Sequence, residues 1–243
     1  MNTKLSVIIP VYNEKINIEN DVKQLKDAFS DYLDSLEIIF VDDNSPDGTA
    51  QEVQRVSKDN PQVKLFQHGV KEGIGAAHRA GYEIATGEYI LCIDADLSQS
   101  PKDLLKIKEK LDEGFDLVIG SRYLKEAKQL GKSPIRDLGS RGMNLICRFI
   151  LGIKLTDCTH TFRGFRSQLF DKFQDRIISK GHPSFQVEFS FWISRYTKKV
   201  TEIPILFKER EEGLGTSKIS IKKEVPPFLI LVTKLFIARL LRK

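Results

Sequence analysis

Residues 89–96 read YILCIDAD, a short apolar run that ends in two carboxylates. We interpret Tyr89–Ile93 as a buried strand, because the run is short, continuous and apolar. Asp94 and Asp96 follow it directly and can converge on one hard cation, which prefers oxygen ligands. Burying both charges without a cation would be costly, so we expect a metal or a shared proton. The alternative is a solvated loop whose acid caps the next helix.

Similar apolar runs alternate with segments whose apolar residues recur every three or four positions. The expected strands are Leu5–Pro10, Glu37–Val41, Val63–Phe66, Tyr89–Ile93 and Leu117–Ile119. The expected helices are Ile18–Leu33, Thr49–Lys58, Ala76–Ala85 and Leu104–Leu111, the last starting near Pro101. This alternation predicts an α/β fold, a Rossmann-like, mainly parallel sheet flanked by helices. Ligands of such sheets bind at the carboxyl ends of the strands.

The second half of the chain has a looser pattern. After a polar connection at 125–134, we expect a helix, a strand, a helix and a strand, at Leu138–Leu151, Thr159–Arg166, Phe185–Tyr196 and Val200–Phe207. We expect one catalytic domain over residues 1–218 and a basic amphipathic helical segment over 219–243.

Charge is distributed unevenly along the 243 residues. Residues 1–120 contain 13 Lys and Arg against 22 Asp and Glu, whereas residues 121–243 contain 25 against 11. A basic half suggests an anionic partner, either nucleic acid, a membrane surface or a phosphorylated substrate. Nucleic acid is disfavoured, because no recognition motif or stacking platform accompanies the basic residues.

Compartment and membrane topology are constrained by three cysteines and by the lengths of the apolar runs. The cysteines lack metal-type spacing and are odd in number, which favours a reducing, intracellular compartment. We expect no signal peptide and no spanning helix, because no uncharged apolar run reaches about 18 residues. The segment 222–243 can lie in a membrane interface or pack on the core, and both interpretations stay open.

Two further strand ends carry residues suited to a nucleoside. Pro10, Tyr12 and Glu14 end the first strand in VIIPVYNE, where stacking and hydrogen bonding are available. Asp42 ends the second strand in VDDNSPDGT, where base or ribose hydroxyls would be recognised. Asp47 in the same motif is better explained as a helix cap.

The basic half offers groups suited to phosphate. Arg122 lies in GSRY, and Arg136 and Ser140, four residues apart, could share one helical face. Arginine with a hydroxyl forms a good phosphate clamp. Arg210 and Lys218 flank a glycine-containing loop and could neutralise a diphosphate leaving group.

These motifs together resemble one known family. VIIPVYNE, VDDNSPDGT, IDADLS, GSRY, DCTHTFRGFR and FKER…SK are similar to the dolichyl-phosphate (polyprenyl-phosphate) mannosyltransferase branch of the family 2 inverting glycosyltransferases. The match runs from Leu5 to about Lys218. The resemblance implies a GT-A fold, a nucleotide-sugar donor such as GDP-mannose and a polyprenyl or dolichyl phosphate acceptor.

The resemblance also assigns site residues. It implies that Pro10, Tyr12, Glu14 and Asp42 hold the nucleoside, with the backbone near Phe40. It implies that Asp94, Ala95 and Asp96 meet the donor phosphates through Mg²⁺ or Mn²⁺. Arg122, Arg136 and Ser140 would bind the lipid phosphate, and Arg210 with Lys218 the diphosphate. Asp94, Asp96, Arg122 and Arg210 are the expected catalytic residues.

Two departures from the family pattern matter. Some members carry glutamine two residues after the second aspartate as a metal ligand, whereas this chain has Ser98 there and Gln99 one position later. Gln99 is our candidate for the third ligand. The loop between Arg210 and Lys218 is about two residues longer than is usual in the family. The chain resembles the branch's short form, without membrane helices.

The expected reaction is an inverting single displacement in which the acceptor phosphate is itself the nucleophile. No protein base is then needed, and Glu188 is a candidate base only for a hydroxyl acceptor. We expect an enzyme at the cytoplasmic face of a membrane, where a membrane protein is a candidate partner. The alternatives are a family 2 transferase with another donor, such as UDP-glucose, or a hydroxyl acceptor, and a catalytically silent nucleotide-sugar-binding subunit.

Overall fold

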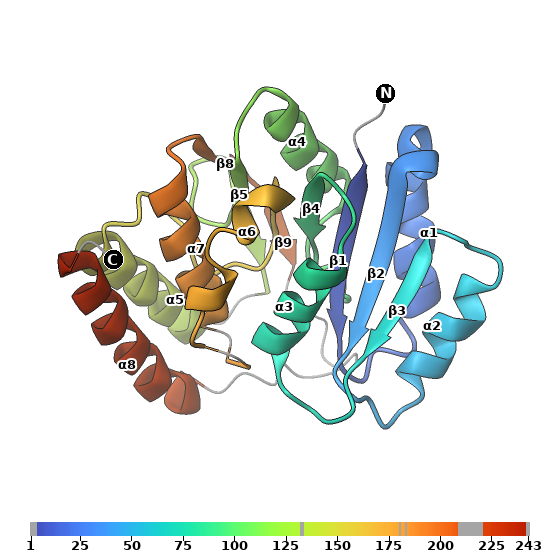
Figure 1. Ribbon diagram of the computed structural model, residues 1–243, viewed down its shortest axis with the longest axis horizontal. Helices are drawn as coiled ribbons and strands as arrows, with labels where there is room; N and C mark the ends of the chain where they lie inside the picture. The colour runs from blue at the N-terminus through green and yellow to red at the C-terminus, as the bar shows by residue number, and fades with distance from the viewer. Residues whose placement is uncertain (1–3, 132–133, 180, 183, 209–220, 242–243) are drawn as a thin grey trace.

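The apolar run at residue 89 forms β4 (Tyr89–Cys92), the central strand of a seven-stranded sheet. The computed structural model describes residues 4–131, 134–179, 181–182, 184–208 and 221–241 (Figure 1). The sheet has the order β3-β2-β1-β4-β7-β5-β8. Only β7 runs antiparallel to its neighbours in it. The predicted mainly parallel α/β sheet is therefore confirmed.

The other strands of this sheet are β1 (Leu5–Val11), β2 (Leu36–Asp42), β3 (Val63–Gln67), β5 (Leu117–Ser121), β7 (Arg163–Arg166) and β8 (Val200–Pro204). A second, two-stranded sheet pairs β6 (Lys128–Leu130) with β9 (Leu206–Lys208). The helices are α1 (Ile18–Ala28), α2 (Thr49–Ser57), α3 (Ile74–Ile84), α4 (Pro101–Asp112), α5 (Pro134–Ile146), α6 (Ser167–Phe170), α7 (Phe185–Tyr196) and α8 (Ile221–Leu240).

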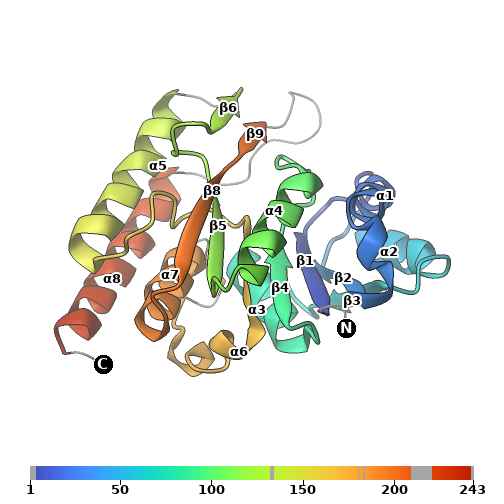
Figure 2. The same cartoon turned by 90° about the horizontal axis from the view of Figure 1, so that it is seen from above.

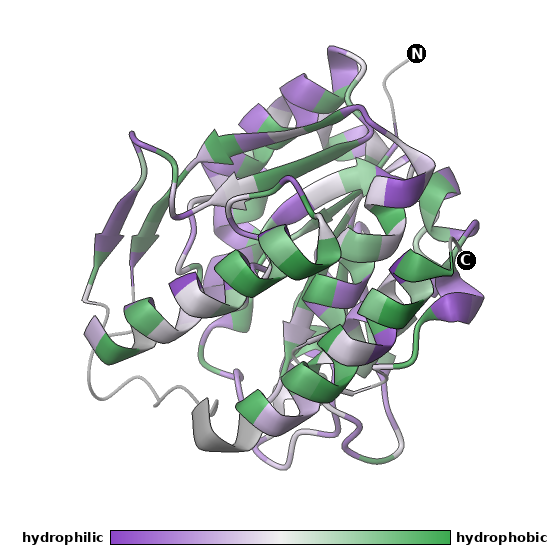
Figure 3. Ribbon diagram, turned by 90° about the vertical axis from the view of Figure 1, so that its left-hand side faces the viewer, coloured by the Kyte–Doolittle hydropathy of each residue, from purple (hydrophilic) through white to green (hydrophobic). Residues whose placement is uncertain are grey.

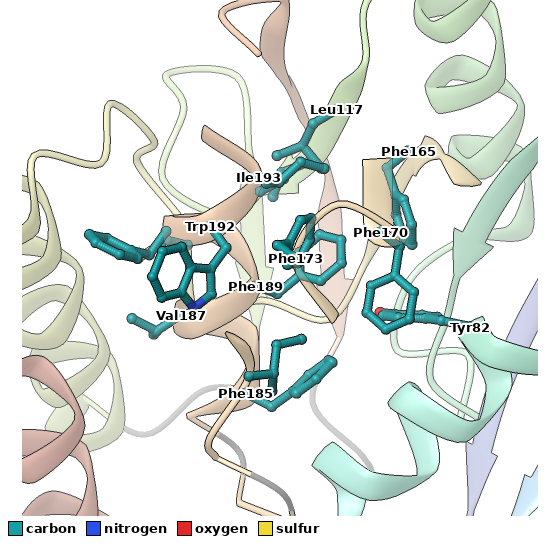
Figure 4. Close-up of a cluster of buried hydrophobic side chains, with 14 of the residues drawn as sticks. Tyr82, Leu117, Phe165, Phe170, Phe173, Phe185, Val187, Phe189, Trp192 and Ile193 are labelled. Carbon is teal, nitrogen blue, oxygen red and sulfur yellow. The ribbon is translucent and has the colours of Figure 1, made fainter. Parts of the chain in front are cut away.

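Helices cover both faces of the large sheet (Figure 2). Successive residues of β1 enter different cores, because side chains of a strand alternate between faces. Val7 and Ile9 belong to the core that includes residues of α1, α2 and α4, whereas Ile8 belongs to the core that includes residues of α3, α7 and α8. The second core is aromatic: Phe189 of α7 lies 4.8 Å from Phe165, centroid to centroid (Figure 4).

Helix α8 belongs partly to this second core. Phe228, Leu231, Val232 and Leu235 are buried there. The core-packing interpretation of segment 222–243 is therefore confirmed for one face of the helix. Within the described residues, no helix combines the length and hydropathy needed to cross a bilayer.

Several expected boundaries are wrong for local reasons. Val200–Phe207 is two strands in two sheets, because Pro204 has no N–H with which to continue the ladder. Only the last four residues of 159–166 form a strand. The helix expected over 18–33 ends at Ala28 and continues as a 3₁₀ segment, Ser30–Ser35. That over 138–151 starts earlier, at Pro134, and ends in a π-helical segment, Cys147–Leu151.

Candidate active site

The candidate site lies where β1, β2, β4 and β5 end at one edge of the sheet. The motifs after these strands therefore face the same edge, as expected for ligand sites of parallel sheets. The loop 157–162 reaches the same edge, because β7 runs the opposite way and begins beside the end of β4: Arg163 pairs with Cys92.

The Asp94 carboxylate is held by two neighbouring side chains. The Thr161 hydroxyl donates to Oδ1 and Oδ2 at 2.9 and 3.0 Å. Gln99 Nε2 donates to Oδ2 at 2.9 Å. Burial raises the pKa of Asp94, and the charge of Asp96 raises it further. A cation bound by both carboxylates would therefore stabilise the ionised forms of Asp94 and Asp96.

Asp96 forms a tight turn with the residues that follow. Its Oδ1 accepts the backbone N–H of Ser98 at 2.9 Å and also the Ser98 hydroxyl. Leu97, between them, has a φ of +45°, a conformation that costs energy for a side chain of this size. Two carboxylates two positions apart, such as those of Asp94 and Asp96, suit a hard divalent ion such as Mg²⁺ or Mn²⁺.

The supply of further protein ligands is limited. Among the described residues, no three Asp, Glu, His or Cys side chains gather to hold a metal. Gln99, our candidate third ligand, is fully buried, and its amide also lies 3.2 Å from His160 Nε2. A hard ion bound by two carboxylates commonly completes its shell with water and substrate phosphate, so the donor set fits.

Arg122 pairs with Asp157, a residue to which the sequence alone assigned no role. Nε and Nη2 donate to the two carboxylate oxygens at 2.7 and 2.8 Å, a bidentate contact. Burial disfavours both charges, but Arg122 holds the pKa of Asp157 well below its usual range, and Asp157 raises that of Arg122. Both groups are therefore charged, and the arginine is fixed at the end of β5.

A surface hollow of about 480 Å³ opens beside this pair. It is lined by Arg122, Tyr123, Leu124, Ala127, Gln129, Pro134, Asp137 and Arg141. Arg141 lies over the Tyr123 ring at 4.7 Å and donates to Asp137 at 2.6 Å. Sequence reasoning missed Arg141, although it lies within the expected helix 138–151 and, in the structure, on α5 with Arg136.

The expected phosphate clamp is only partly described. Ser140 lies on α5, where its hydroxyl interacts with Tyr123. The side chain of Arg136 lies outside the described part of the chain, as do Arg210 and Lys218. The roles expected of these four residues stay predictions.

The residues expected to hold a nucleoside gather after β1 and β2. Asp42 is buried and accepts the backbone N–H and hydroxyl of Ser45. Glu14 accepts from Asn17 Nδ2 at 2.7 Å. Lys71 Nζ lies 3.4 Å from the centroid of the Tyr12 ring. Pro10, the fourth of these residues, is half-buried in β1.

The predictions for four further residues can be compared with their burial and hydrogen bonds. Phe40 and Ala95 lie in the core formed with α1, α2 and α4, so only their backbones could meet a ligand. Asp47 accepts the backbone N–H of Thr49, the first residue of α2, at 3.0 Å, but the N-cap position itself is taken by Gly48. Glu188 is fully buried and accepts from Ile178 and Ser179 N–H groups, which leaves it unsuited to act as a base.

The missed residues share one signal. Asp157, Thr159 and Thr161 are polar residues two positions apart in the segment directly before β7. Thr159 accepts from Arg122 Nη2 at 3.3 Å, and Thr161 holds Asp94. Asn144 of α5 joins this loop through the backbone N–H of Cys158, at 2.9 Å.

Residues 6–173 match the sequence profile described as "Glycosyl transferase family 2". The chain belongs to this family. It is 35% identical over 221 residues to the undecaprenyl-phosphate mannosyltransferase of Micrococcus luteus, covering 89% of this chain and 88% of that protein. It is 34% identical over 219 residues to the polyprenol monophosphomannose synthase of Mycolicibacterium smegmatis, covering 88% and 80%. These relatives confirm the polyprenyl-phosphate mannosyltransferase branch and a glycosyltransferase.

Solved structures share the fold. Staphylococcus aureus TarS 1–349 with UDP-GlcNAc superposes with a TM-score of 0.67 at 19% identity, over 96% of this chain and 66% of that one. The mannosyltransferase PcManGT of Pyrobaculum calidifontis, in complex with GDP-Man and Mn²⁺, gives 0.63 at 18% identity, over 100% and 65%. The expected GT-A fold is confirmed.

Proposed function

We propose that this glycosyltransferase moves mannose from GDP-mannose to a polyprenyl or dolichyl phosphate with inversion. The observation that carries the proposal is the meeting of Asp94, Asp96 and Arg122 at one sheet edge beside an open hollow. A donor diphosphate and an acceptor phosphate need an acidic metal-binding group and a basic group side by side. The names of the two relatives above support the choice of sugar and lipid.

Asp94 and Asp96 would hold Mg²⁺ or Mn²⁺ on the donor diphosphate. When bound, such an ion stabilises the negative charge that develops on the leaving diphosphate. Thr161 and Gln99 orient Asp94 for this task through the hydrogen bonds described above. We propose that Arg210 and Lys218 add positive charge to the same diphosphate, and that Pro10, Tyr12, Glu14 and Asp42 hold the nucleoside.

The acceptor phosphate acts as the nucleophile in this proposal. Its second pKa is about 6, so the phosphate is largely ionised at neutral pH and no protein base is required. The buried, fully engaged carboxylate of Glu188 agrees with a mechanism without a base. Arg122, with Arg136 and Ser140, would hold the phosphate in line with the anomeric carbon, and Arg141 stands at the same hollow.

An apolar face beside the hollow supports a lipid acceptor. Helices α5 and α8 lie side by side, and apolar residues run along both (Figure 3). The exposed apolar residues of these helices and of the π-helical segment between them include Ile135, Leu138, Phe149, Ile230, Ile237 and Leu240. Exposed Arg148 and Lys234 interrupt them. Apolar side chains mixed with cations suit a membrane interface with anionic lipid.

The apolar face of α5 and α8 supports a cellular location and a division of the chain into two parts. We propose that residues 1–218 form the catalytic domain and that 219–243, together with α5, rest on the membrane as a peripheral contact. The three cysteines are buried free thiols, which agrees with a reducing compartment and hence the cytoplasmic side.

The decisive experiment supplies purified protein with Mn²⁺, a polyprenyl phosphate and one labelled nucleotide sugar at a time. We expect organic-extractable label from GDP-mannose, and none after Asp96→Ala. Asp34→Ala, which removes an exposed acid far from the site, should transfer normally. If only UDP-glucose gave labelled lipid, the donor would be UDP-glucose and not GDP-mannose. If no donor gave a lipid product, the proposal would be overturned. Near-normal transfer by Asp96→Ala would remove the metal assignment.

A further inference from the structure

The Gln99 side chain joins Asp94 to a buried histidine. Its Nε2 donates to Asp94 Oδ2 at 2.9 Å and lies 3.2 Å from His160 Nε2, and its Oε1 accepts the backbone N–H of Asp94 at 3.4 Å. Gln99 is fully buried and His160 is 4% exposed. The amide therefore contacts Asp94 at two points and uses its second N–H on the histidine.

The histidine fixes which way this amide faces. His160 Nδ1 lies 2.8 Å from the carbonyl oxygen of Gly120, which can only accept a hydrogen bond. Nδ1 therefore carries the proton in the neutral ring, and Nε2 is left as an acceptor. Burial lowers the pKa of His160 to about 3, and the charge of Arg122 lowers it too, so the ring is neutral near pH 7.

The amide cannot turn over without losing contacts. If Gln99 exchanged its oxygen and nitrogen, an oxygen would face the acceptor nitrogen of His160 and a carboxylate oxygen of Asp94. Gly120 lies in β5, so the chain of contacts runs from β5 through His160 and Gln99 to the acid after β4. The backbone of β5 thus orients the Asp94 carboxylate through His160 and Gln99.

We propose that Gln99 and His160 are positioning residues that orient the Asp94 carboxylate for the divalent ion, and that Gln99 is not itself a metal ligand. This inference rests on the metal site of the proposed function. Partners that orient a metal ligand through hydrogen bonds typically contribute about 10- to 100-fold to metal affinity. His160 has no contact with Asp94 in this chain of bonds and would act only through Gln99.

The test is Mn²⁺ affinity, measured from the electron paramagnetic resonance signal of free Mn²⁺, with GDP and without sugar or lipid. Gln99→Leu and His160→Phe keep the volume and remove the hydrogen bonds. We expect each to weaken Mn²⁺ binding about tenfold. The double variant should bind about as weakly as either single one, because both act through one chain of contacts.

A ligand role for Gln99 gives a different pattern and would overturn the inference. Gln99→Leu would then lose affinity, His160→Phe would bind as the wild type does, and the double variant would match Gln99→Leu. Independent effects that multiply in the double variant would also overturn it, because the two residues would not be acting in series.

Two controls separate positioning from general damage. His78→Phe changes another fully buried histidine, which contacts Tyr82 and Phe185, and should leave Mn²⁺ affinity unchanged. GDP affinity without metal should be the same in all variants. If Asp94→Asn binds Mn²⁺ as tightly as the wild type, the ion is held elsewhere and the inference is wrong, whereas lipid-linked product would still support the transferase.

Discussion

At the scale of single residues, the pair Arg122–Asp157 should contribute strongly to stability. The Asp157 side chain is fully buried and that of Arg122 is 10% exposed. Removing one partner leaves a buried charge uncompensated, which typically costs about 3–5 kcal/mol. We therefore expect Asp157→Asn to lower the free energy of unfolding by about that amount, as measured by urea titration.

A surface pair provides the comparison for this variant. Arg55 and Glu19 form an ion pair in which both side chains are more than half exposed. Glu19→Gln should cost less than about 1 kcal/mol, because exposed pairs contribute little. Equal losses in the two variants would contradict the importance we give to burial at Arg122.

His78 should make stability depend on pH. Burial lowers the pKa of His78 to about 3, and the charge of Arg163 lowers it to a smaller extent. In the unfolded chain the pKa of histidine is about 6.5. Between these values the unfolded chain binds a proton that the native protein does not. The free energy of unfolding therefore falls as pH drops from about 6.5 towards 3.

The expected contribution of this one group is about 2 kcal/mol between pH 7 and pH 5. Urea titration at the two pH values measures it in wild type and in His78→Phe, which has no titratable ring. The variant should lose about that much of the pH dependence. An unchanged difference between the two pH values would show that His78 titrates normally in the folded protein.

At the scale of elements, the start of α3 depends on two glycines that touch. Gly73 precedes the helix with a φ of +96°, and a Cβ there would lie 2.3 Å from the carbonyl oxygen of Gly181. Gly73→Ala would combine backbone strain with this clash. We expect a loss of about 1–3 kcal/mol in the free energy of unfolding.

Gly142 is the matched control, because it lies inside α5 with nothing within 4 Å of an added Cβ. Gly142→Ala should stabilise the protein by about 0.5–1 kcal/mol, since alanine restricts the unfolded chain and favours a helix. Thermal or urea unfolding of both variants should therefore give shifts of opposite sign. A neutral Gly73→Ala would mean that the two loops separate easily.

The elements that sequence predicts well are those with a repeating pattern. The first five strands and α7 follow apolar runs or helical spacing, and the structure has them within a few residues. Strands β6 and β9 have three residues each, too few to show any alternation. Their pairing depends on Ile205, whose oxygen accepts from Lys128 N–H in a distant segment.

Residues of the candidate site also fall into those that the sequence pattern identifies and those that it does not. Residues at strand ends, such as Asp42, Asp94 and Arg122, could be found because strand ends mark ligand sites. Their partners could not, because Asp157 lies 35 residues from Arg122 and Thr161 lies 67 residues from Asp94. Only the pairing of β7 with β4 and β5 brings the 157–161 loop to them.

At the scale of the whole molecule, the apolar face of α5, the π-helical segment and α8 should bind vesicles. Phe149 and Ile230 are 76% and 59% exposed on it. We expect the double variant Phe149→Ser/Ile230→Ser to bind anionic vesicles at least about tenfold more weakly, because burying one such side chain contributes about 1.5–3 kcal/mol. Co-sedimentation with phosphatidylglycerol vesicles measures this.

The control removes an exposed apolar residue from another part of the surface. Leu33→Ser, in the 3₁₀ segment after α1, should bind vesicles as the wild type does. The double variant should still transfer sugar to a short, water-soluble polyprenyl phosphate, since the catalytic residues are intact. Equal vesicle binding by all three proteins would show that this face does not meet the membrane.

The antiparallel strand β7 also sets the order in which the chain can complete its fold during synthesis. Strand β5 pairs only with β7 and β8 in the described sheet, and both are synthesised after it. A nascent chain that stops before residue 163 therefore exposes the edges of β4 and β5, which invites wrong pairing. Ribosome-bound chains of 160 residues should be cleaved by protease around residues 117–121, and chains carrying β7 and β8 should resist.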